Sequence, residues 1–366
     1  MSYQKPDEAN PLVPEPLIKD IEARFHGFQA PGTTIDPTMS TPDELRRFGL
    51  PPKPHSSAAP LLQKVWGQVF GRALRPQAFM VEPNLIRATR FRLFEKAVAT
   101  ASFAGMNCEA SSNWSGAYIS ANQDKRFLQV WGTWTVPANL QLPPPAFQGP
   151  ANIPYFCANW IGLDGQRRYL DSSLPQMGTV SILQPDGTTT AESWAQWWAR
   201  DSANTAPVPL GLAVVPGDIV ACVLTAWSPT SVRGVMVNLS ASPPTAVPVV
   251  MDAPMVTLSN GSSVQPEIAG ATAEWIVERP KVPPQPSQPP SRYNFPDYGQ
   301  SGFDFCLAVE GDSVDIFSLF TGMSRDLTGA RRIRMFDVLG NPVRTQYISM
   351  ASKLDNLTLQ TKYGSF

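Results

Sequence analysis

Two carboxylates lie on one side of a short segment that has the pattern of a β-strand. Residues 271–280 read ATAEWIVERP. In an extended strand, alternate side chains point to the same side, and one side here carries Ala273, Trp275 and Val277. The other side carries Glu274, Ile276 and Glu278. The first side is typical of a core face. The second is either a solvated face, as is usual in antiparallel sheets, or a surface for acid–base chemistry.

The spacing of the two glutamates limits the reactions that they could share. Four strand residues place Glu274 and Glu278 about 13 Å apart. The two carboxyl groups of a retaining glycosidase lie about 5–5.5 Å apart, and those of an inverting one about 6.5–9.5 Å apart. A glycosidase built on this pair is therefore the weaker interpretation.

Histidine is almost absent, which restricts the chemistry further. The chain has two histidines, His26 and His55, and both precede the tryptophan-rich part of the sequence. Serine and cysteine nucleophiles need an imidazole beside them, and zinc sites commonly use histidine as a ligand. We therefore expect no metal and no cofactor, and we expect carboxylates and amides to carry any catalysis.

Composition indicates a globular chain rich in strands and turns. Of 366 residues, 43% are hydrophobic and 16% are charged, and the formal net charge is −1. The weak charge argues against a nucleic-acid partner and against a polybasic membrane surface. The 38 prolines and ten tryptophans favour many short strands and turns, as in a β-sandwich.

The four cysteines are Cys108, Cys157, Cys222 and Cys306, and no two of them form a CxxC pair. They could form two disulfides in any of three connectivities, or remain as buried thiols. The N-terminal residues MSYQKPDEANPLVPEP are polar and proline-rich and do not resemble a secretory signal. We therefore expect free thiols, and the sequence leaves the compartment unknown.

Residues 1–110 are expected to form a proline-rich, partly helical N-terminal segment. Thr41, Pro42 and Glu44 have the spacing of an N-cap, a first-turn proline and a capping box. A second helix is predicted within SAAPLLQKVWGQVFGRAL and a third within NLIRATRFRLFEKAVAT. Residues 1–100 contain 13 Lys and Arg against 10 Asp and Glu, so this region is slightly positive.

Residues 111–366 are expected to form an all-β, concanavalin-like antiparallel β-sandwich of two sheets. RFLQVWGTWTVP alternates, with Leu128, Val130, Gly132, Trp134 and Val136 on one face. Turns are predicted at Asp164-Gly165, Asp186-Gly187 and Pro216-Gly217-Asp218, the last of them between the predicted strands LGLAVV and DIVACVLTAW. Residues 279–299 are too rich in proline for a central strand and are expected to form a loop over the surface.

Seven pieces of this β-rich region resemble, in order, the glutamic peptidases, also called eqolisins. The pieces are NWSGAYI, GTWTVP, NWIGLDG, LPQMG, ESWAQWWA, VVPGD and AEWIVE. Each piece alone is weakly specific, but together they span roughly residues 111–310. The resemblance implies a concanavalin-like β-sandwich, an acid-acting endopeptidase and a polypeptide substrate.

Carried over position by position, the resemblance implies that Gln176 and Glu278 are the catalytic pair. Trp160 and Asp164 match the family's active-site tryptophan and buried aspartate, and Glu274 is grouped with these supporting residues. Gln196 occupies the place of a glutamate in the family, and Val180 the place of a frequent aspartate. These two changes put in doubt the hydrogen-bonded network that tunes Glu278. Concanavalin-like glucanases carry acids at alternate strand positions, where this chain has Ile276.

The implied chemistry divides between one acid and one amide. An ionised Glu278 would take a proton from water and return it to the leaving amine, so the resemblance implies activity at acidic pH. Gln176 would donate a hydrogen bond to the developing oxyanion without adding charge. The alternatives are ordinary structural roles: Gln176 beside a turn, Trp160 in a core, and Asp164 capping its own turn.

The function expected from the sequence is hydrolysis of peptide bonds by a monomer without nucleic-acid or membrane partners. One alternative is a non-catalytic sandwich that binds peptide or carbohydrate, and the less favoured one is a glycoside hydrolase. The N-terminal segment is expected to be either a pro-segment over an acidic cleft or a permanent accessory domain. A pro-segment would be cut between about residues 95 and 112, in the stretch that precedes the resemblance.

Overall fold

The computed structural model of the protein describes several stretches of the chain. They are residues 34–54, 60–77, 80–82, 108–150, 152–165, 173–199, 207–257, 261–280, 293–314, 316–339 and 344–364. Their helices are α2 (Pro42–Arg47), α3 (Pro60–Phe70), α4 (Ile316–Thr321) and the 3-10 helix η1 (Pro145–Phe147). The other regular elements in these stretches are β-strands, as the all-β prediction requires.

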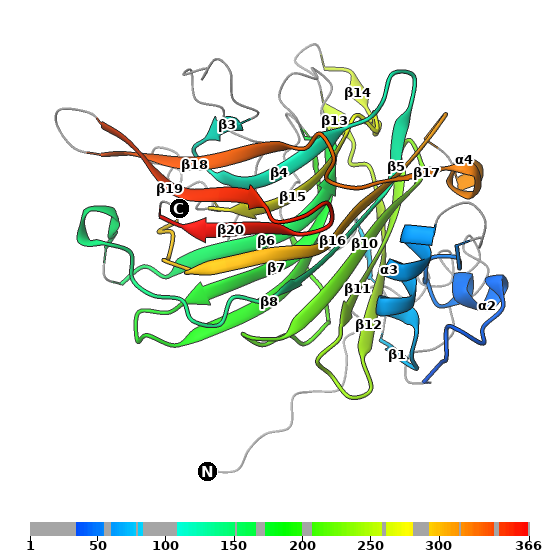
Figure 1. The fold of residues 1–366 in the computed structure, drawn as a ribbon, viewed down its shortest axis with the longest axis horizontal. Coiled ribbons are helices and arrows are strands. Elements are labelled where there is room, and N and C mark those ends of the chain that lie inside the picture. The colour runs from blue at the N-terminus through cyan, green and yellow to red at the C-terminus, as the bar shows by residue number, and fades with distance from the viewer. Residues whose placement is uncertain are drawn as a thin grey trace.

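Two antiparallel sheets form the body of the molecule (Figure 1). The first sheet contains, in spatial order, β9 (Val208–Pro209), β8 (Thr189–Ala199), β7 (Ser173–Leu183), β6 (Tyr155–Leu163), β15 (Thr272–Glu278), β4 (Trp114–Ser120) and β18 (Arg331–Leu339). The second contains β17 (Met323–Arg325), β16 (Gln300–Gly311), β5 (Arg126–Thr135), β10 (Ile219–Ser228), β11 (Ser231–Asn238) and β12 (Thr245–Asp252). The predicted two-sheet sandwich is therefore confirmed.

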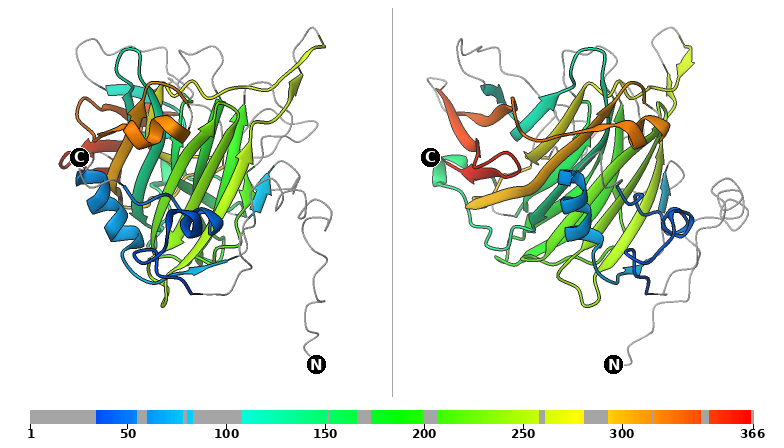
Figure 2. Two further views of the ribbon diagram at one scale, coloured as in Figure 1. Left: turned by 90° about the vertical axis from the view of Figure 1, so that its right-hand side faces the viewer. Right: turned by 45° about the vertical axis from the view of Figure 1, so that its right-hand side comes forward.

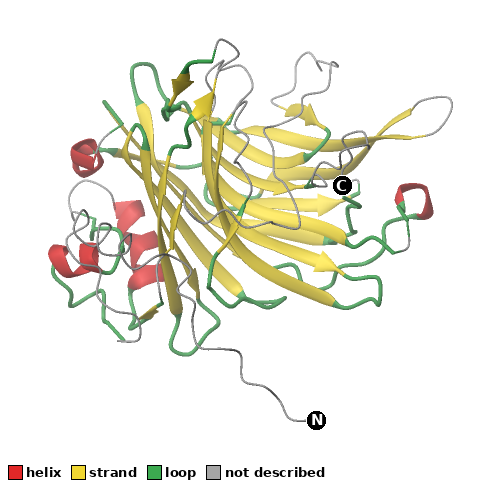
Figure 3. Cartoon of the chain, turned by 180° about the vertical axis from the view of Figure 1, so that it is seen from behind, coloured by secondary structure: helices red, strands yellow, loops and turns green. Residues whose placement is uncertain are grey.

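Edge strands connect the two sheets and extend them. The pairs β18–β19, β19–β20 and β20–β16 join the sheets through β19 (Arg344–Lys353) and β20 (Leu359–Tyr363). Three short strands pair in parallel: β1 (Arg75–Pro76) and β2 (Met80–Glu82) with β12, and β3 (Cys108–Ser111) with β18. A separate ribbon consists of β13 (Val256–Thr257) and β14 (Ser263–Val264). Figure 3 shows the long strands curving across the molecule.

The main core lies between the facing sheets. It includes Trp134 from the second sheet, and Trp197 and Trp275 from the first. Ala273 and Val277 point into the same core, so the predicted core face of strand β15 is confirmed. The indole Nε1 of Trp275 donates a hydrogen bond of 2.7 Å to the backbone oxygen of Trp131, which ties β15 to the second sheet. The face of β15 that carries the two glutamates therefore points away from the second sheet.

Strand β5 departs from strict alternation at Leu128. Val130 and Trp134 point into the main core as predicted, whereas Leu128 packs on the opposite side of the second sheet. The pairing of β5 with β16 shifts register there, since Val309 pairs with Gln129 and Glu310 with Phe127. The extra residue in β5 is a β-bulge, which moves Leu128 to the other face. The prediction that Leu128 shares a face with Val130 is therefore wrong.

The predicted glycine turns are present, but one predicted strand is not. Gly165, Gly187 and Gly217 have φ values of 93°, 86° and 93°, a conformation that favours glycine. The LGLAVV segment forms no ladder, although Leu210, Leu212 and Val214 bury alternate side chains in the main core. Three of its carbonyl groups accept bonds from side chains instead: Ser193 Oγ donates to the backbone oxygens of Leu210 and Leu212, and Asn238 Nδ2 to that of Ala213.

The first two predicted helices are confirmed. The Thr41 hydroxyl accepts a bond of 3.2 Å from the Glu44 N–H, and a Glu44 carboxylate oxygen accepts one of 2.7 Å from the Thr41 N–H. This capping box begins α2, and Pro42 is its first residue. Helix α3 buries five of its side chains against the second sheet; they are Leu62, Val65, Trp66, Val69 and Phe70. The third predicted helix and most of the proline-rich loop 279–299 lie outside the described residues.

Three further expectations concern the state of the cysteines, metal binding and membrane-spanning helices. All four cysteines are free thiols, as expected, and Cys157, Cys222 and Cys306 are buried. Burial raises the pKa of Cys157 and Cys222 well above that of an exposed thiol. Among the described residues, no group of three His, Cys, Asp or Glu side chains could hold a metal ion. None of the described helices has the length and hydropathy needed to cross a membrane.

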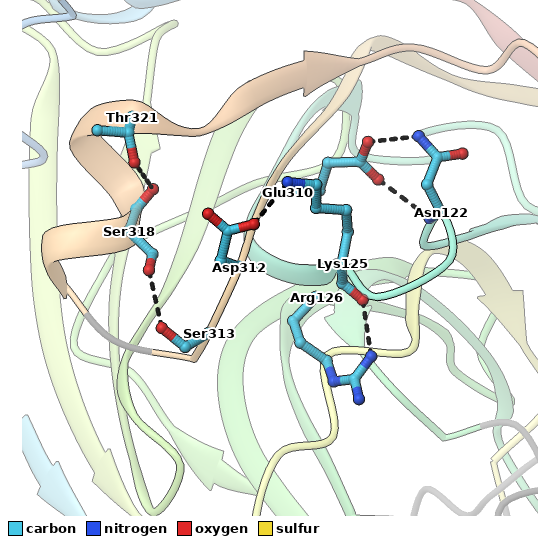
Figure 4. Close-up of polar contacts among 8 residues, drawn as sticks. All are labelled: Asn122, Lys125, Arg126, Glu310, Asp312, Ser313, Ser318 and Thr321. Carbon is cyan, nitrogen blue, oxygen red and sulfur yellow. Dashed lines mark hydrogen bonds and ion pairs between the residues drawn. The ribbon is translucent and has the colours of Figure 1, made fainter.

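A polar network fixes the loop between β4 and β5 (Figure 4). The backbone N–H and the side-chain amide of Asn122 donate bonds of 3.2 and 2.6 Å to the buried carboxylate of Glu310. Lys125 and Asp312 form an ion pair of 2.5 Å beside it. The N–H of Ala121 also bonds to the carbonyl of Ala271, directly before β15. The network therefore helps to hold the segment that leads into the strand with the two glutamates.

Candidate active site

The outward face of the first sheet brings the candidate residues together in three rows that cross the strands. Pairing defines the first row as Trp114, Glu278, Ala158, Val180 and Glu192. The second row is Gly116, Ile276, Trp160, Gly178 and Trp194. The third row is Tyr118, Glu274, Gly162, Gln176 and Gln196. All six predicted site residues except Asp164 therefore share one face, which is opposite to the face that packs on the second sheet.

Glu278 is a fully buried carboxylate, with 0% of the residue exposed. Trp160 Nε1 donates a bond of 2.9 Å to its Oε2, and Asn113 Nδ2 donates one of 3.3 Å to its Oε1. Glu274 is equally buried. The interpretation of this face as a solvated one is therefore wrong. The indole of Trp160 and the amide of Asn113 are both neutral donors.

Asn113 is a contact of Glu278 that the sequence did not identify as a site residue. Its neighbour Ser111 fixes its amide, because the Ser111 hydroxyl donates a bond of 2.9 Å to Asn113 Oδ1. This bond turns the amide nitrogen toward Glu278. The sequence signal is the NWSGAYI piece, but residues 113 and 278 become neighbours only through the pairing of Trp114 with Glu278.

Trp160 lies at the centre of the three rows. Its ring contacts that of Trp114 edge to face, with 5.0 Å between centroids, in an apolar cluster on this side of the sheet. Glycines on the neighbouring strand and on its own strand make room for it. A Cβ on Gly178 would lie 2.6 Å from Trp160 Cβ, and one on Gly162 would lie 3.0 Å from Trp160 Cζ3. Trp160 is therefore a core aromatic, as one of the two interpretations of the sequence predicts. It is also a hydrogen-bond donor to Glu278.

Gln176 is a buried amide within strand β7, three residues after the strand begins. Its Nε2 donates a bond of 2.7 Å to Gln196 Oε1, and both residues are 0% exposed. Its Oε1 accepts no hydrogen bond within the described part of the chain. The interpretation of Gln176 as an amide beside a turn is wrong, because β7 runs from Ser173 to Leu183. One of its amide hydrogens is held by Gln196, which leaves the second hydrogen and Oε1 for other partners.

The register separates Gln176 from Glu278 along a diagonal of the sheet. Gln176 shares the third row with Glu274, from which only Gly162 separates it. Glu278 is four residues further along β15, so it lies two strand spacings, about 10 Å, across the sheet and about 13 Å along it. Trp160 occupies the middle of this diagonal. A reaction that uses both groups must therefore take place above Trp160.

Glu274 and Val180 complete the surroundings of the two groups. Thr272 Oγ1 donates a bond of 3.1 Å to Glu274 Oε1. Glu274 Oε2 would lie 3.3 Å from a Cβ on Gly165, so a glycine at that position leaves room for the carboxylate. Val180 shares the first row with Glu278 and Ala158, where it packs in the apolar cluster. Ala158 and Val180 are both apolar, and they separate Glu278 from Glu192 along the first row.

Asp164 lies at the end of β6 and supports the beginning of β15. Its two oxygens accept four backbone N–H bonds, of 2.6 to 3.4 Å; the donors are Ala269, Gly270, Ala271 and Thr272. Asp164 has a φ of 67°, which aspartate and asparagine tolerate better than most residues. Its alternative role as a cap of its own turn is wrong, because its bonds go to a segment more than a hundred residues away. Burial raises its pKa to about 6, although these four donors oppose the rise.

Comparison with known proteins identifies the family. The family model described as the peptidase A4 family matches residues 112–335, which is more than half of the chain. The chain belongs to the peptidase A4 family. It is therefore a hydrolase that acts on peptide bonds, and the expected membership of the glutamic peptidases is confirmed.

Solved structures of three such peptidases are similar to this one. Scytalido-glutamic peptidase with a peptide-based transition state analog has 19% identity and a TM-score of 0.49, over 69% of this chain and 98% of that one. SCP-B, an eqolisin in complex with the tripeptide Ala-Ile-His, has 19% identity and a TM-score of 0.47 over the same shares. Aspergilloglutamic peptidase from Aspergillus niger has 18% identity and a TM-score of 0.39, over 57% and 99%. A search of curated protein sequences finds no match.

Replacing Asn113 with aspartate is expected to move the pH dependence of the peptidase. The new carboxylate would lie beside Glu278 Oε1 and disfavour a second negative charge there, because like charges repel in a buried site. The acidic limb of kcat/KM should then move to higher pH by about one unit or more. The measurement is the pH profile of peptide hydrolysis by both proteins. Gln123→Glu, at an exposed position, adds the same charge and should leave the profile in place. An unmoved limb in Asn113→Asp would show that a charge beside Glu278 does not control the pH dependence.

Replacing Asp164 with asparagine is expected to flatten the pH dependence of stability between about pH 4 and pH 6. The folded-state pKa of about 6 is above the ordinary 3.8, so the folded protein binds more protons in this range. The stability that this gives is complete below about pH 4 and is lost as the pH rises through 6, by up to about 3 kcal/mol. Asparagine cannot titrate, and urea unfolding at several pH values measures the difference.

The matched control for this variant is Asp124→Asn. Asp124 also has a positive φ, of 59°, but it is exposed. Its replacement should keep the loss of stability that the unmodified peptidase shows as the pH rises. If Asp164→Asn keeps that loss as well, the pKa of Asp164 does not control it.

Proposed function

We propose that this peptidase is an acid-acting endopeptidase in which Glu278 activates the attacking water and Gln176 stabilises the oxyanion. The observation that carries the proposal is the presence of two buried groups on the same face of one sheet. The Glu278 carboxylate accepts bonds from two neutral N–H donors, and the Gln176 amide donates a bond to Gln196. A carboxylate in such a place can act as a general base, and an amide N–H can stabilise developing negative charge.

The reaction begins with a water molecule between Glu278 and the peptide carbonyl carbon. Glu278 takes one proton from the water while the water oxygen attacks that carbon. The carbonyl π electrons move to the oxygen, and the free hydrogen of the Gln176 amide donates to this oxyanion. The tetrahedral intermediate then collapses, and the protonated Glu278 gives its proton to the leaving nitrogen. The products are a carboxylic acid and an amine, and Glu278 is ionised again.

Neighbouring residues orient the two groups but take no part in the bond changes. The N–H groups of Trp160 and Asn113 hold the Glu278 carboxylate. Gln196 holds one hydrogen of the Gln176 amide. Because Gln196 is neutral at every pH, it accepts this bond whether the medium is acidic or neutral. The replacement of an expected acid by Gln196 therefore keeps Gln176 oriented without a titrating group.

The alternatives from the sequence are less well supported than peptide hydrolysis. The family match assigns the chain to peptidases rather than to a non-catalytic binding sandwich or a glycoside hydrolase. Glu274 and Glu278 also remain four residues apart on one strand, with the buried Ile276 between them. Concanavalin-like glucanases carry an acid at the position of Ile276, so this strand lacks the acid that such a glycosidase would use.

The proposed function is tested by digestion of an unfolded protein from about pH 2 to about pH 7. We expect cleavage within the substrate chain, strongest at about pH 3–4, and no inhibition by pepstatin. Release of single residues from the substrate ends, or activity only near neutral pH, would contradict an acid-acting endopeptidase. No cleavage at high protein concentration, at any pH in the series, would contradict the catalytic role altogether.

A further inference from the structure

We propose that the N-terminal lobe, defined as residues 34–54, 60–77 and 80–82, is a permanent part of the folded peptidase. A cut in residues 83–107 would then leave a two-chain protein with the lobe still bound, and would not release a pro-segment. This inference does not depend on the roles of Gln176 and Glu278. The lobe precedes the residues that the family model matches, which begin at 112.

Helix α3 of the lobe packs on the outer face of the second sheet. Phe70 is completely buried and Trp66 is 3% exposed. The Phe70 ring packs on that of Trp131 from β5, with 6.1 Å between centroids and a steep angle of 76°. The same cluster contains side chains of three neighbouring strands; they are Leu128, Ala221, Val223, Val235 and Val237. Figure 2 shows α3 against these strands. The lobe and the sandwich therefore share a hydrophobic core.

Backbone hydrogen bonds attach the lobe along the edge of the second sheet as well. Strand β1 pairs in parallel with β12, and the N–H groups of Arg75 and Gln77 donate bonds of 2.8 and 2.7 Å to Pro244 and Ala246. Strand β2 continues along the same edge. Arg72 Nη2 donates a bond of 2.8 Å to the carbonyl of Leu239. These bonds satisfy groups that would otherwise form an open sheet edge.

The position of the lobe argues against its acting as a cover of the active site. The lobe packs on the second sheet, whereas Gln176 and Glu278 lie on the outward face of the first sheet. The two sheets and the main core lie between them. The part of the pro-segment hypothesis that concerns these residues is therefore not supported. Removal of the lobe would instead uncover a contiguous apolar surface on the second sheet, which favours aggregation.

The test is to cut the chain and ask whether the lobe leaves. A recognition sequence for a site-specific protease replaces residues 96–101, and a sample without that protease is carried through the same steps to control for self-digestion. After cleavage, size-exclusion chromatography and mass spectrometry are run first in native buffer and then in denaturant. We expect both fragments to elute in one peak at the size of the uncut protein, and to separate only in denaturant. Separation in native buffer would overturn the inference.

Two variants show whether the shared core holds the lobe. Trp66→Ala removes a buried ring and should increase release of the lobe from the cut protein. Gln68→Ala changes an exposed position on the same helix and should have no effect. If the cut protein precipitates, hydrogen exchange of the uncut protein decides between the possibilities. We expect α3 to be protected as strongly as β10 and β11, and exchange of α3 as an independent unit would overturn the inference.

Discussion

Glutamine in place of Glu278 is expected to lower kcat by about 10²–10⁴-fold, because the variant keeps the shape of the side chain but cannot take a proton from water. The amide oxygen can still accept a bond from Trp160 or Asn113, so the fold should be retained. The measurement is steady-state hydrolysis of a peptide substrate at acidic pH, with circular dichroism and a melting curve for each protein. Folded protein with near-normal turnover would exclude Glu278 as the base.

Glu274→Gln is the matched control for this experiment. Glu274 lies on the same strand and the same face, and it is equally buried. It is also the glutamate that shares a row with Gln176, so it is the rival acid. We expect this variant to keep kcat within about tenfold of the unmodified peptidase. The reverse result, an inactive Glu274→Gln and an active Glu278→Gln, would identify Glu274 as the catalytic carboxylate.

Removal of the Gln176 amide is expected to lower kcat by about 10²–10³-fold, which is the usual loss for one oxyanion donor. The loss should appear in kcat rather than in KM, because the hydrogen bond strengthens as charge develops on the carbonyl oxygen. Gln176→Ala also leaves the Gln196 carbonyl without this donor, so some loss of stability is expected and must be measured separately.

The control for Gln176→Ala is removal of an amide elsewhere. Gln123 is exposed on the loop between β4 and β5, and its replacement by alanine should change neither kcat nor stability. If Gln176→Ala raises KM and leaves kcat unchanged, Gln176 binds the substrate but does not stabilise the transition state. That result would remove the amide from the proposed mechanism, and the oxyanion would need another donor.

Local patterns in the sequence were sufficient for much of the fold. The period of two in residues 272–278 predicted which side of β15 enters the core, because a strand between two sheets must alternate. The capping box at Thr41 and the glycine turn at Gly187 were predicted because both depend on residues within a few positions of each other. The bulge at Leu128 was not predicted, since it depends on the register of β5 with β16.

The candidate site could be predicted only in part, because its contacts join distant segments. The resemblance selected Gln176 and Glu278, but only strand pairing reveals that Trp160 lies between them and that Glu274 shares the row of Gln176. Asn113 was missed because its contact with Glu278 spans 165 residues. The docking of the N-terminal lobe on the second sheet was also missed, because an amphipathic helix does not indicate which sheet it covers.

A crystal structure of the peptidase with a bound peptide-based transition-state analogue would test the central claim most directly. We expect the tetrahedral centre of the analogue above Trp160, with Gln176 Nε2 about 2.7–3.1 Å from one of its oxygens. The Glu278 carboxylate should contact the other oxygen, which marks the place of the attacking water. An analogue held between Gln176 and Glu274, with Glu278 out of reach of both oxygens, would contradict the proposed pair.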